Sequence, residues 1–350
     1  WSDVALDVAT SDWYLRVFDL SKQEPLRVLH AARPGGGHQL VFTLHHSVTD
    51  GVGAIALFDA LLARYAALDG ERVPVPVPVT PSGARLRSLL VRRGARLVGS
   101  LLRTNVQNAR RFGARRASLL ERVDARAEGL HCRVVDLPVA EWARIRERAT
   151  TLGCTRNDLL LSAFLRGATA WRREQGLRDE PFRALVPADL RSEFGIGRSL
   201  QNHLGVIEAD FAPDDVDSAD LPFRVGARVL AERTPDRVLA TPMALALLGA
   251  ILPPFVFRAF FRWLDERPTA FMYSFLFSHI RVAEGLRVPA SVRARRVYCL
   301  SGLPRQPGLG LTVTALPDSV TAALAYSPPR LSDGGARRLM ECFAEALRAM

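Results

Sequence analysis

Two adjacent histidines, His45 and His46, are the side chains in this 350-residue sequence whose type and setting best suit chemistry. An imidazole takes up a proton near neutral pH and returns it, because its ordinary pKa is about 6.5. Asp50 and Gly51 follow within the same short segment. A carboxylate there can fix the local geometry, and a glycine leaves room where a substrate passes. The pattern therefore predicts a general base held in a structured turn.

The segment lies between a predicted strand and a predicted helix. Residues 39–44 form a nearly continuous apolar run with β-branched and aromatic members, which is typical of a buried strand. Apolar residues then recur at helical spacing from Val52 onward, with Asp50 at the helix entry. Successive side chains of a strand point to opposite faces, so His45 and His46 cannot share one pocket unless the strand has already ended. One of the two is therefore free to act as a base.

Two histidines in this position could instead bind a metal ion or pack in the core. A metal site needs a third ligand and a common face, and the neighbouring sequence supplies neither, so no metal is expected. The pattern His-His-x-x-x-Asp-Gly arises by chance in roughly one such chain in two thousand. Together with the strand-turn-helix context, this rarity favours the catalytic interpretation.

Residues 45–51, His-His-Ser-Val-Thr-Asp-Gly, closely resemble the signature of the HHxxxDG acyltransferase superfamily. That superfamily comprises condensation domains of peptide synthetases, chloramphenicol-acetyltransferase-like enzymes, plant-type acyltransferases and bacterial wax ester synthase/diacylglycerol acyltransferases. The sequence resembles the wax ester synthase and condensation types most. The resemblance implies that His46 is the general base, and that Asp50 points away from the substrate and pairs with an arginine. His45 and Gly51 complete the motif in a structural role.

The same resemblance implies a fold and a reaction. Strand-rich and helix-rich segments alternate, which is typical of the α/β class, and the family adds two lobes of the chloramphenicol-acetyltransferase type. Each lobe is then a mixed sheet with flanking helices, with His46 between the lobes. The reaction implied first is acyl transfer from acyl-CoA to a hydroxyl group of an alcohol or lipid, without a cofactor. The alternatives are amide or ester formation from carrier-protein thioesters, as in condensation domains, and a non-catalytic relative that binds thioesters.

Two later stretches bear on substrate binding. The segment around Asn157 resembles the wax ester synthase segment built on an Asn-Asp pair, which makes Asn157 a substrate-binding candidate. An equally good interpretation is structural, because Thr155 and Asp158 have the spacing of a helix cap. Further along, the family often carries Ser-Asn in a strand where this chain has Ser278 and His279. That departure puts an oxyanion or substrate role there in doubt.

Composition sets limits on partners and compartment. The net charge is +11, but Lys22 is the only lysine and the arginines are dispersed, which is more typical of a coding bias than of a binding surface. No nucleic-acid-binding module accompanies the charge, so nucleic acid is not an expected partner. The four cysteines lie far apart without a Cys-x-x-Cys pair, which is typical of a reducing, cytoplasmic compartment.

Three regions are expected along the chain. Residues 1–80 form an N-terminal lobe with the histidine motif, residues 81–130 a basic crossover segment, and residues 131–350 a C-terminal lobe. Relatives of this type place more chain before the motif than is found here. The N-terminal lobe is therefore expected to lack its start, and with it the arginine that pairs with Asp50.

The basic segment from residue 85 to residue 128 reads as helical, with a stripe of leucines. It either packs between the lobes, which we favour, or lies as an amphipathic helix on an anionic membrane surface, which would make the protein peripherally membrane-associated. Residues 244–263 predict a pair of apolar helices, too short to span a bilayer, that fill the lobe rather than line an acyl tunnel. Strands are expected at 273–280, 296–300, 309–316 and 320–326, before a final helix at 332–348.

Overall fold

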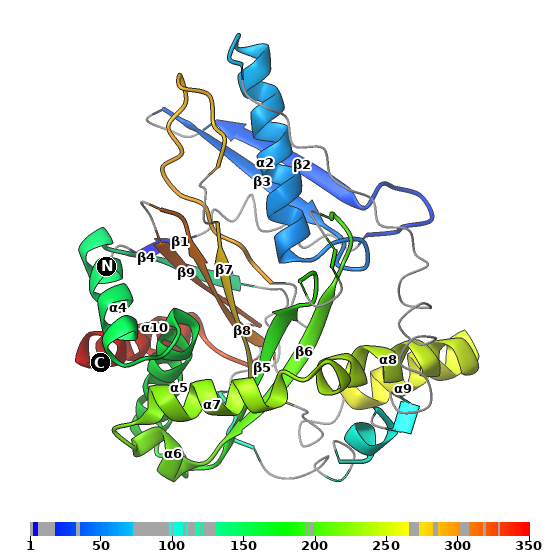
Figure 1. The fold of residues 1–350 in the computed structure, drawn as a ribbon, viewed down its shortest axis with the longest axis vertical. Coiled ribbons are helices and arrows are strands. Elements are labelled where there is room, and N and C mark those ends of the chain that lie inside the picture. The colour runs from blue at the N-terminus through cyan, green and yellow to red at the C-terminus, as the bar shows by residue number, and fades with distance from the viewer. Residues whose placement is uncertain are drawn as a thin grey trace.

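The larger of the two lobes is built on a seven-stranded mixed sheet (Figure 1). The computed structural model of the protein describes residues 3–5, 18–32, 36–72, 98–99, 101–107, 110, 116–119, 121, 131–192, 195–196, 199–265, 273–282, 286–301, 308–317, 320–327 and 330–350. The strands run in the order β1 (Asp3–Ala5), β4 (His131–Leu137), β9 (Val320–Tyr326), β8 (Leu309–Ala315), β7 (Phe275–Arg281), β5 (Phe182–Asp189) and β6 (Leu204–Phe211). Strand β7 pairs in parallel with β5 and with β8, and the other neighbours are antiparallel. Every side chain of β8 and β9 is buried, so these strands lie in the core.

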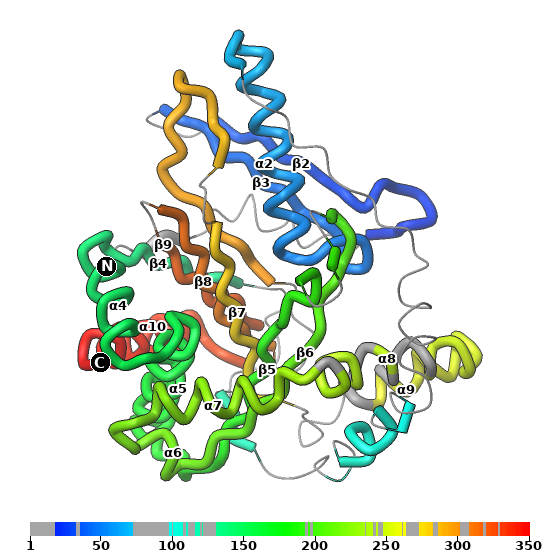
Figure 2. Tube along the Cα trace, viewed as in Figure 1, coloured from blue at the N-terminus to red at the C-terminus, as the bar shows by residue number. Residues whose placement is uncertain are grey.

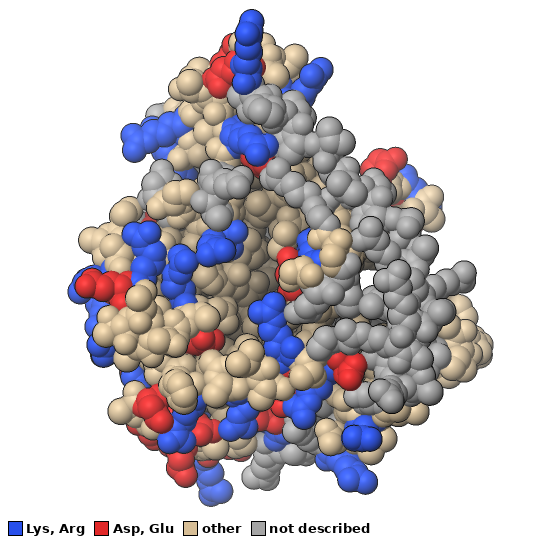
Figure 3. Space-filling view, in the orientation of Figure 1, with Lys and Arg blue, Asp and Glu red and all other residues tan. Residues whose placement is uncertain are grey.

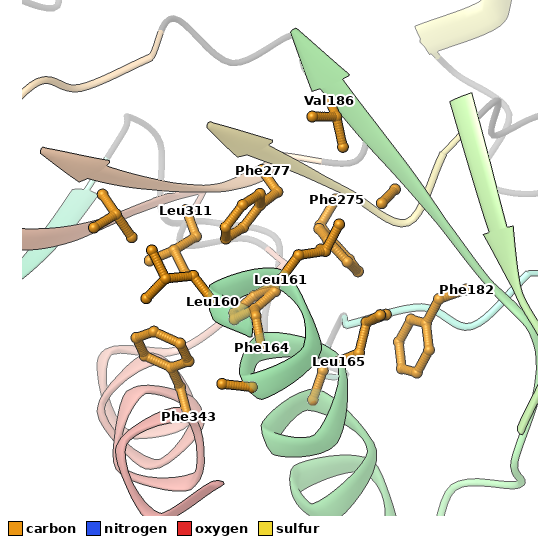
Figure 4. Packing of buried hydrophobic residues seen from close by; sticks show 14 of the residues in the cluster. Leu160, Leu161, Phe164, Leu165, Phe182, Val186, Phe275, Phe277, Leu311 and Phe343 are labelled. Carbon is orange, nitrogen blue, oxygen red and sulfur yellow. The ribbon is translucent and has the colours of Figure 1, made fainter. Parts of the chain in front are cut away.

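Helix α5 (Arg156–Glu174) is the centre of the core. Its buried face lies against the sheet, while α10 (Asp333–Ala349) packs along its other side. The ring centroid of Phe164 in α5 lies 4.8 Å from that of Phe275 in β7 and 6.0 Å from that of Phe343 in α10. Figure 4 shows these rings together with leucines of α5 between the sheet and α10. Because this helix is enclosed on both sides, it fixes the strands that carry the site.

The remaining helices of this lobe are α4 (Val139–Thr151), α6 (Pro213–Asp217), α7 (Leu221–Glu232), α8 (Pro235–Ile251) and α9 (Pro254–Asp265). Helices α8 and α9 are the apolar pair that the sequence predicts. The first turns of α8 fill the lobe, since residues 238–240 are buried, and α8 packs on β6. At the turn between the two helices, however, Ile251 is 68% exposed and Phe255 is 72% exposed. The prediction that these helices fill the lobe therefore holds for the start of α8 but not for the turn between α8 and α9.

The histidine motif belongs to a smaller unit made of β2 (Leu26–Ala32), β3 (His38–Leu44) and α2 (Gly51–Leu68). The two strands form an antiparallel hairpin. Helix α2 covers the hairpin, with the ring centroid of Phe58 at 4.7 Å from that of Phe42. Strand β3 is half-buried rather than fully buried, because the described residues provide this sheet with only one partner strand. By length and composition α2 could cross a membrane, a test that core helices of soluble proteins also pass.

Two segments cross between the expected regions. Strand β1, at residues 3–5, pairs with β4 in the large sheet, although residues 1–80 are expected to belong to the other lobe. The connection from β7 to β8 runs beside α2 (Figure 2). There the backbone N–H of Arg287 donates to Asp59 (3.2 Å), and the hydroxyl of Ser291 donates to Asp69 (2.6 Å). The boundaries at residues 80 and 130 thus separate the chain less cleanly than the sequence predicts.

The prediction of a strand at residues 296–300 is wrong. These residues lie beside β8 but form no strand. The guanidinium of Arg296 pairs with Asp136 of β4, and the N–H of Cys299 donates to the hydroxyl of Thr314 rather than to a backbone carbonyl. Alternating apolar residues are therefore explained here by side-chain packing, without a ladder of backbone hydrogen bonds.

Within the basic segment, residues 98–99, 101–107 and 110 are helical as predicted, whereas the described residues 116–119 and 121 are not helical, contrary to the prediction. Leu101 is 6% exposed and belongs to the core, while the neighbouring Leu102 is 60% exposed. The Asn105 amide donates to the carbonyl of Ala240 in α8 (3.3 Å), so this turn packs on the large lobe. The other residues of the segment, including Leu97, lie outside the described residues.

Leu101 and Leu102 provide a matched pair that tests this packing. We expect Leu101→Glu to lower the free energy of unfolding by about 3 kcal/mol, because a charge would enter the core without a partner. Leu102→Glu should change it by no more than about 0.5 kcal/mol. Urea unfolding of both variants measures the difference, and equal stability would contradict the packing. Flotation with anionic vesicles tests the membrane alternative, which predicts binding at low salt that Leu102→Glu removes.

Candidate active site

Asp50 is the residue on which the motif is built. It is the N-cap of α2, and its Oδ1 accepts a hydrogen bond from the backbone N–H of Gly53 (2.8 Å). Its Oδ2 accepts from the backbone N–H of His203 (2.7 Å), which begins the approach to β6. Its side chain has no exposed surface. The carboxylate therefore caps the helix and holds a loop from the other lobe, as a positioning group does.

The arginine partner of Asp50 is Arg191, in the loop after β5. Its Nη2 donates to Asp50 Oδ1 (2.9 Å) and to the carbonyl oxygens of Ser199 (3.1 Å) and Gln201 (2.8 Å). Burial opposes the charge on Arg191, but its hydrogen bond to the Asp50 carboxylate, with help from Asp189, raises the pKa of Arg191 above the usual value. The expectation that this arginine lies in a missing N-terminal part is therefore wrong. The pair joins two segments that are 141 residues apart.

Two glycines of α2 allow the lobes to approach this closely. A Cβ on Gly51 would lie 2.9 Å from Cδ1 of Ile280, the penultimate residue of β7. A Cβ on Gly53 would lie 2.6 Å from the carbonyl oxygen of Leu200. Gly51, which the motif predicts as a structural residue, thus lies against a flexible side chain of the large lobe, whereas Gly53 lies against its backbone. The first turn of α2 is the seam between the two parts of the molecule.

His46 lies exposed at this seam, just beyond β3. The side-chain amide of Asn202 donates to the His46 carbonyl oxygen (2.9 Å), and its nitrogen lies 3.2 Å from His46 Nδ1. The residues before β6 thus hold both the backbone and the ring of His46. The structure brings together His46, Asp50, Arg191 and Asn202.

His45 has a different environment from His46. Its Nδ1 lies 2.7 Å from the Ser47 hydroxyl, and its ring meets the edge of Phe18 at 5.7 Å between centroids. The guanidinium of Arg27 covers the same phenylalanine at 4.0 Å. His45 is half-buried and faces its own hairpin, which leaves His46 as the histidine that meets the other lobe.

Asn157 is half-buried in the first turn of α5. The helix cap next to it is formed: the Thr155 hydroxyl accepts from the N–H of Asp158 (3.2 Å), and Asp158 accepts from the N–H of Thr155 (2.9 Å). Among the residues that the structure describes, no hydrogen bond or ion pair joins Asn157 to the motif. The capping interpretation of this stretch is confirmed, and the substrate-binding role of Asn157 stays a prediction.

Ser278 and His279 point to opposite faces of β7. His279 lies on the helix side, with its ring 6.1 Å from that of Trp142 in α4. Burial, and to a smaller extent the charges of Arg156 and Arg281, lower the pKa of His279 to about 4. The imidazole is therefore neutral at pH 7. Ser278 shares the other face of the strand with Ile280, which touches the first turn of α2, so of this dipeptide only the serine faces the seam.

Sequence reasoning gave no role to Asn202 and placed the partner of Asp50 elsewhere. Both residues lie in the connection between β5 and β6, where polar residues follow an apolar strand. That pattern marks a strand end, and catalytic and binding residues gather in such loops. Nothing local in the sequence, however, says which loop meets the histidine motif.

Neither the protein-family models nor the curated proteins contain a match to this sequence. Solved structures do match it. The SgcC5 protein from Streptomyces globisporus aligns with a TM-score of 0.61 at 14% identity, covering 98% of this chain and 78% of that one. The cyclization-docking bidomain of EpoB from Sorangium cellulosum aligns with a TM-score of 0.66 at 14% identity, covering 98% and 67%. The condensation domain of the monacolin K polyketide synthase MokA aligns at 0.60 and 15% identity, covering 96% and 75%.

The chain has the fold of a condensation domain. At these identities the comparison shows the fold alone, and with it the two-lobed α/β architecture that the histidine motif implies. Within the described residues, the contacts of Gly51 and Asp50 place the motif between the two parts of the molecule. The particular closeness to wax ester synthases receives no support from these structures.

The first site prediction concerns Asp50 and uses Asp189 as its control. Asp50→Ala should lower the free energy of unfolding by about 3–5 kcal/mol, because Arg191 would remain buried without its main partner. Asp189 pairs with the same guanidinium but is 40% exposed, so Asp189→Ala should cost no more than about 1 kcal/mol. Chemical denaturation measures both values. An Asp50→Ala protein that keeps its stability and loses only turnover would make Asp50 catalytic, contrary to its positioning role.

The second site prediction concerns pH. The pKa of His279 is lower in the folded chain than in the unfolded chain, so between pH 6.5 and pH 4 the unfolded state binds the extra proton. His279 should therefore destabilise the protein progressively as pH falls through this window, by about 3 kcal/mol at most. His279→Gln should lack this loss, and His38→Gln, an exposed control, should keep it. Urea titrations at pH 7 and pH 5 measure the change, and identical pH dependence in parent and His279→Gln would rule the effect out.

Proposed function

We propose that this protein transfers an acyl group from a carrier-bound thioester to an amine or hydroxyl acceptor, in a condensation-type reaction with His46 as general base. The observation that carries the proposal is the arrangement around His46. The imidazole is exposed at the seam between the lobes and is held there by Asn202, while the turn beneath it is fixed by Asp50 and Arg191. A ring with this exposure and support is suited to proton transfer at a substrate.

The reaction follows from what a free imidazole can do. The acceptor N–H or O–H gives its proton to the ring as its nitrogen or oxygen attacks the thioester carbonyl carbon. The carbon–sulfur bond then breaks, and the thiolate leaves with the proton that the ring returns. No covalent bond to the protein forms in this sequence, so no nucleophilic serine or cysteine is required.

Asn202 lies beside Nδ1 of His46, and this position bears on which ring nitrogen can act as the base. Its amide orientation is set by two contacts, since its nitrogen donates to the His46 carbonyl and its oxygen accepts from the N–H of Leu204 (3.1 Å). With Nδ1 next to this amide, Nε2 is the nitrogen left to meet a substrate. Nε2 accepts a proton only while the neutral ring holds its own proton on Nδ1. For Nε2 to act as the base, Nδ1 must carry the ring proton, so the contact between the Asn202 nitrogen and Nδ1 must break when the substrate binds.

The choice of donor rests on the structural relatives. Those with a similar fold include the first condensation domain of the calcium-dependent antibiotic synthetase and a condensation domain described for chain release from the enacyloxin polyketide synthase. This similarity in fold favours a carrier-bound thioester over free acyl-CoA as the donor. Acyl transfer from acyl-CoA to an alcohol or lipid uses the same base and remains the second candidate, supported by the motif.

Replacing His46 tests the chemistry. His46→Ala should lower turnover by about 10²- to 10⁴-fold, the usual contribution of a general base, while the melting temperature stays close to that of the parent. Thiol release is measured with carrier-bound and CoA thioesters, each offered to a panel of amines and alcohols. His38→Ala, an exposed histidine of the same hairpin, is the control and should retain full activity.

The outcomes separate the candidates. Release only from carrier-bound thioesters supports the condensation reaction, and release from acyl-CoA with an alcohol supports the second candidate. Equal turnover in the parent and His46→Ala would overturn the mechanism. A parent protein that binds thioesters without releasing thiol would be a non-catalytic relative.

A further inference from the structure

Three arginines gather at the carboxyl end of β7. Arg281 is the last residue of that strand, and Arg156 is the first of α5. The guanidinium of Arg156 lies 5.8 Å from the ring centroid of Trp142 in α4, and that ring lies 6.1 Å from the ring of His279. Arg281 follows His279 on the same face of β7, and Arg146 follows Trp142 by one turn of α4. Three elements therefore bring one positive charge each to the same place.

The positive charge of this arginine cluster, Arg146, Arg156 and Arg281, is not compensated within the described part of the chain. The pKa of Arg156 is lowered by burial and by the charges of Arg281 and Arg146. In the described residues none of the three forms an ion pair. Two carboxylates close to the cluster in sequence are engaged elsewhere, since Glu141 pairs with Arg144 and Asp158 caps its own helix.

Two other exposed arginines of the same lobe, by contrast, have acidic partners. Arg173 pairs with Asp179 and Asp217, and Arg338 pairs with Glu174, Glu341 and Glu345. Those guanidiniums are exposed and could have been left to solvent, yet each has several acidic partners. The charges of Arg281 and Arg146 act on Arg156, and an anion bound among the cluster would offset this repulsion.

The arginine cluster lies at the end of the sheet that meets the histidine motif. Ile280, next to Arg281, touches the first turn of α2 at Gly51. Helix α5 runs so that Arg156 is near this end, because Phe164 further along packs on Phe275 at the start of β7. Figure 3 shows a hollow in the middle of the face turned toward the viewer, with Lys and Arg side chains along one margin of it. An anion bound there would belong to a molecule that enters the seam.

We infer that Arg146, Arg156 and Arg281 bind the phosphate group of a pantetheine-type thioester donor. The inference rests on the proposed function, which supplies the thioester. A phosphate offers several oxygens and at least one negative charge, and the planar fork of arginine matches such oxygens in pairs. The phosphodiester of a carrier protein and the phosphates of CoA share this chemistry. The neutral ring of His279 adds no charge and makes an edge contact with the ring of Trp142.

The test compares two ligands that differ only in the phosphate, 4′-phosphopantetheine and pantetheine. By isothermal titration calorimetry the parent should bind phosphopantetheine at least about tenfold more tightly, because hydrogen bonds between charged groups are each worth about that factor. Arg156→Gln with Arg281→Gln should remove this preference and leave the affinity for pantetheine unchanged.

The control variant carries the same change in net charge elsewhere. Arg228→Gln with Arg258→Gln alters exposed arginines of α7 and α9 and should keep the full preference for phosphopantetheine. Circular dichroism confirms that each variant is folded. If the double substitution in the cluster unfolds the protein, Arg281→Gln alone, at an exposed strand end, should still reduce the preference severalfold.

Competition identifies the source of the phosphate. CoA and a phosphopantetheinylated carrier protein are each titrated against bound phosphopantetheine, and the source is the one whose affinity falls in the cluster variant. Equal binding of phosphopantetheine and pantetheine by the parent would overturn the inference, as would the same loss in the control variant.

Failure here is distinguishable from failure of the proposed function. Pantetheine thioesters lack the phosphate, so the cluster variant should transfer their acyl group at the parent rate, whereas His46→Ala should not. His46→Ala should in turn bind phosphopantetheine as tightly as the parent. Transfer that depends on His46 but shows no phosphate preference would leave the reaction standing and remove the phosphate site.

Discussion

The buried ion pair between Asp50 and Arg191 is the interaction on which the rest of the site depends. Removing two charges from water is costly, and the cost is offset only when their hydrogen-bonding capacity is met. Asp50 meets this condition with the N–H groups of Gly53 and His203, and Arg191 does so with the carbonyls of Ser199 and Gln201. The pair thus orders the start of α2 and the loop before β6 together. One carboxylate thereby fixes both the turn that carries His46 and the loop that carries Asn202.

This dependence explains the composition of the motif without reference to its chemistry. Asp50 is needed as a cap and ion-pair partner, and Gly53 is needed because the backbone of Leu200 in the other lobe leaves no room for a Cβ. His46 is the residue of the motif whose side chain remains exposed beside the opposite lobe and is held there by a side chain from it. The arginine cluster lies at the same end of the large sheet, so the positions assigned to donor and base belong to one continuous seam.

Local signals in the sequence predicted the elements well. The strand before the motif, the cap and start of α2, the capping box of α5 and the final helix all follow from periodicity and terminal residues, which act over a few positions. Long-range pairings could not be predicted in the same way. The partnership of Asp50 with Arg191, the pairing of the three-residue β1 with β4, and the passage of residues 286–301 beside α2 depend on tertiary packing. The strand wrongly expected at residues 296–300 shows the converse, because an apolar alternation can arise from packing alone.

A double-mutant cycle on Asp50 and Arg191 tests the central claim most directly. Asp50→Asn, Arg191→Gln and the double variant are compared with the parent in free energy of unfolding and in the rate of thiol release. If the pair organises the site, the two substitutions should be strongly coupled, with an interaction energy of about 1.5–3 kcal/mol, and the second should add little to the loss of rate caused by the first. Additive effects on both stability and rate would mean that the two residues act independently, and would contradict the account.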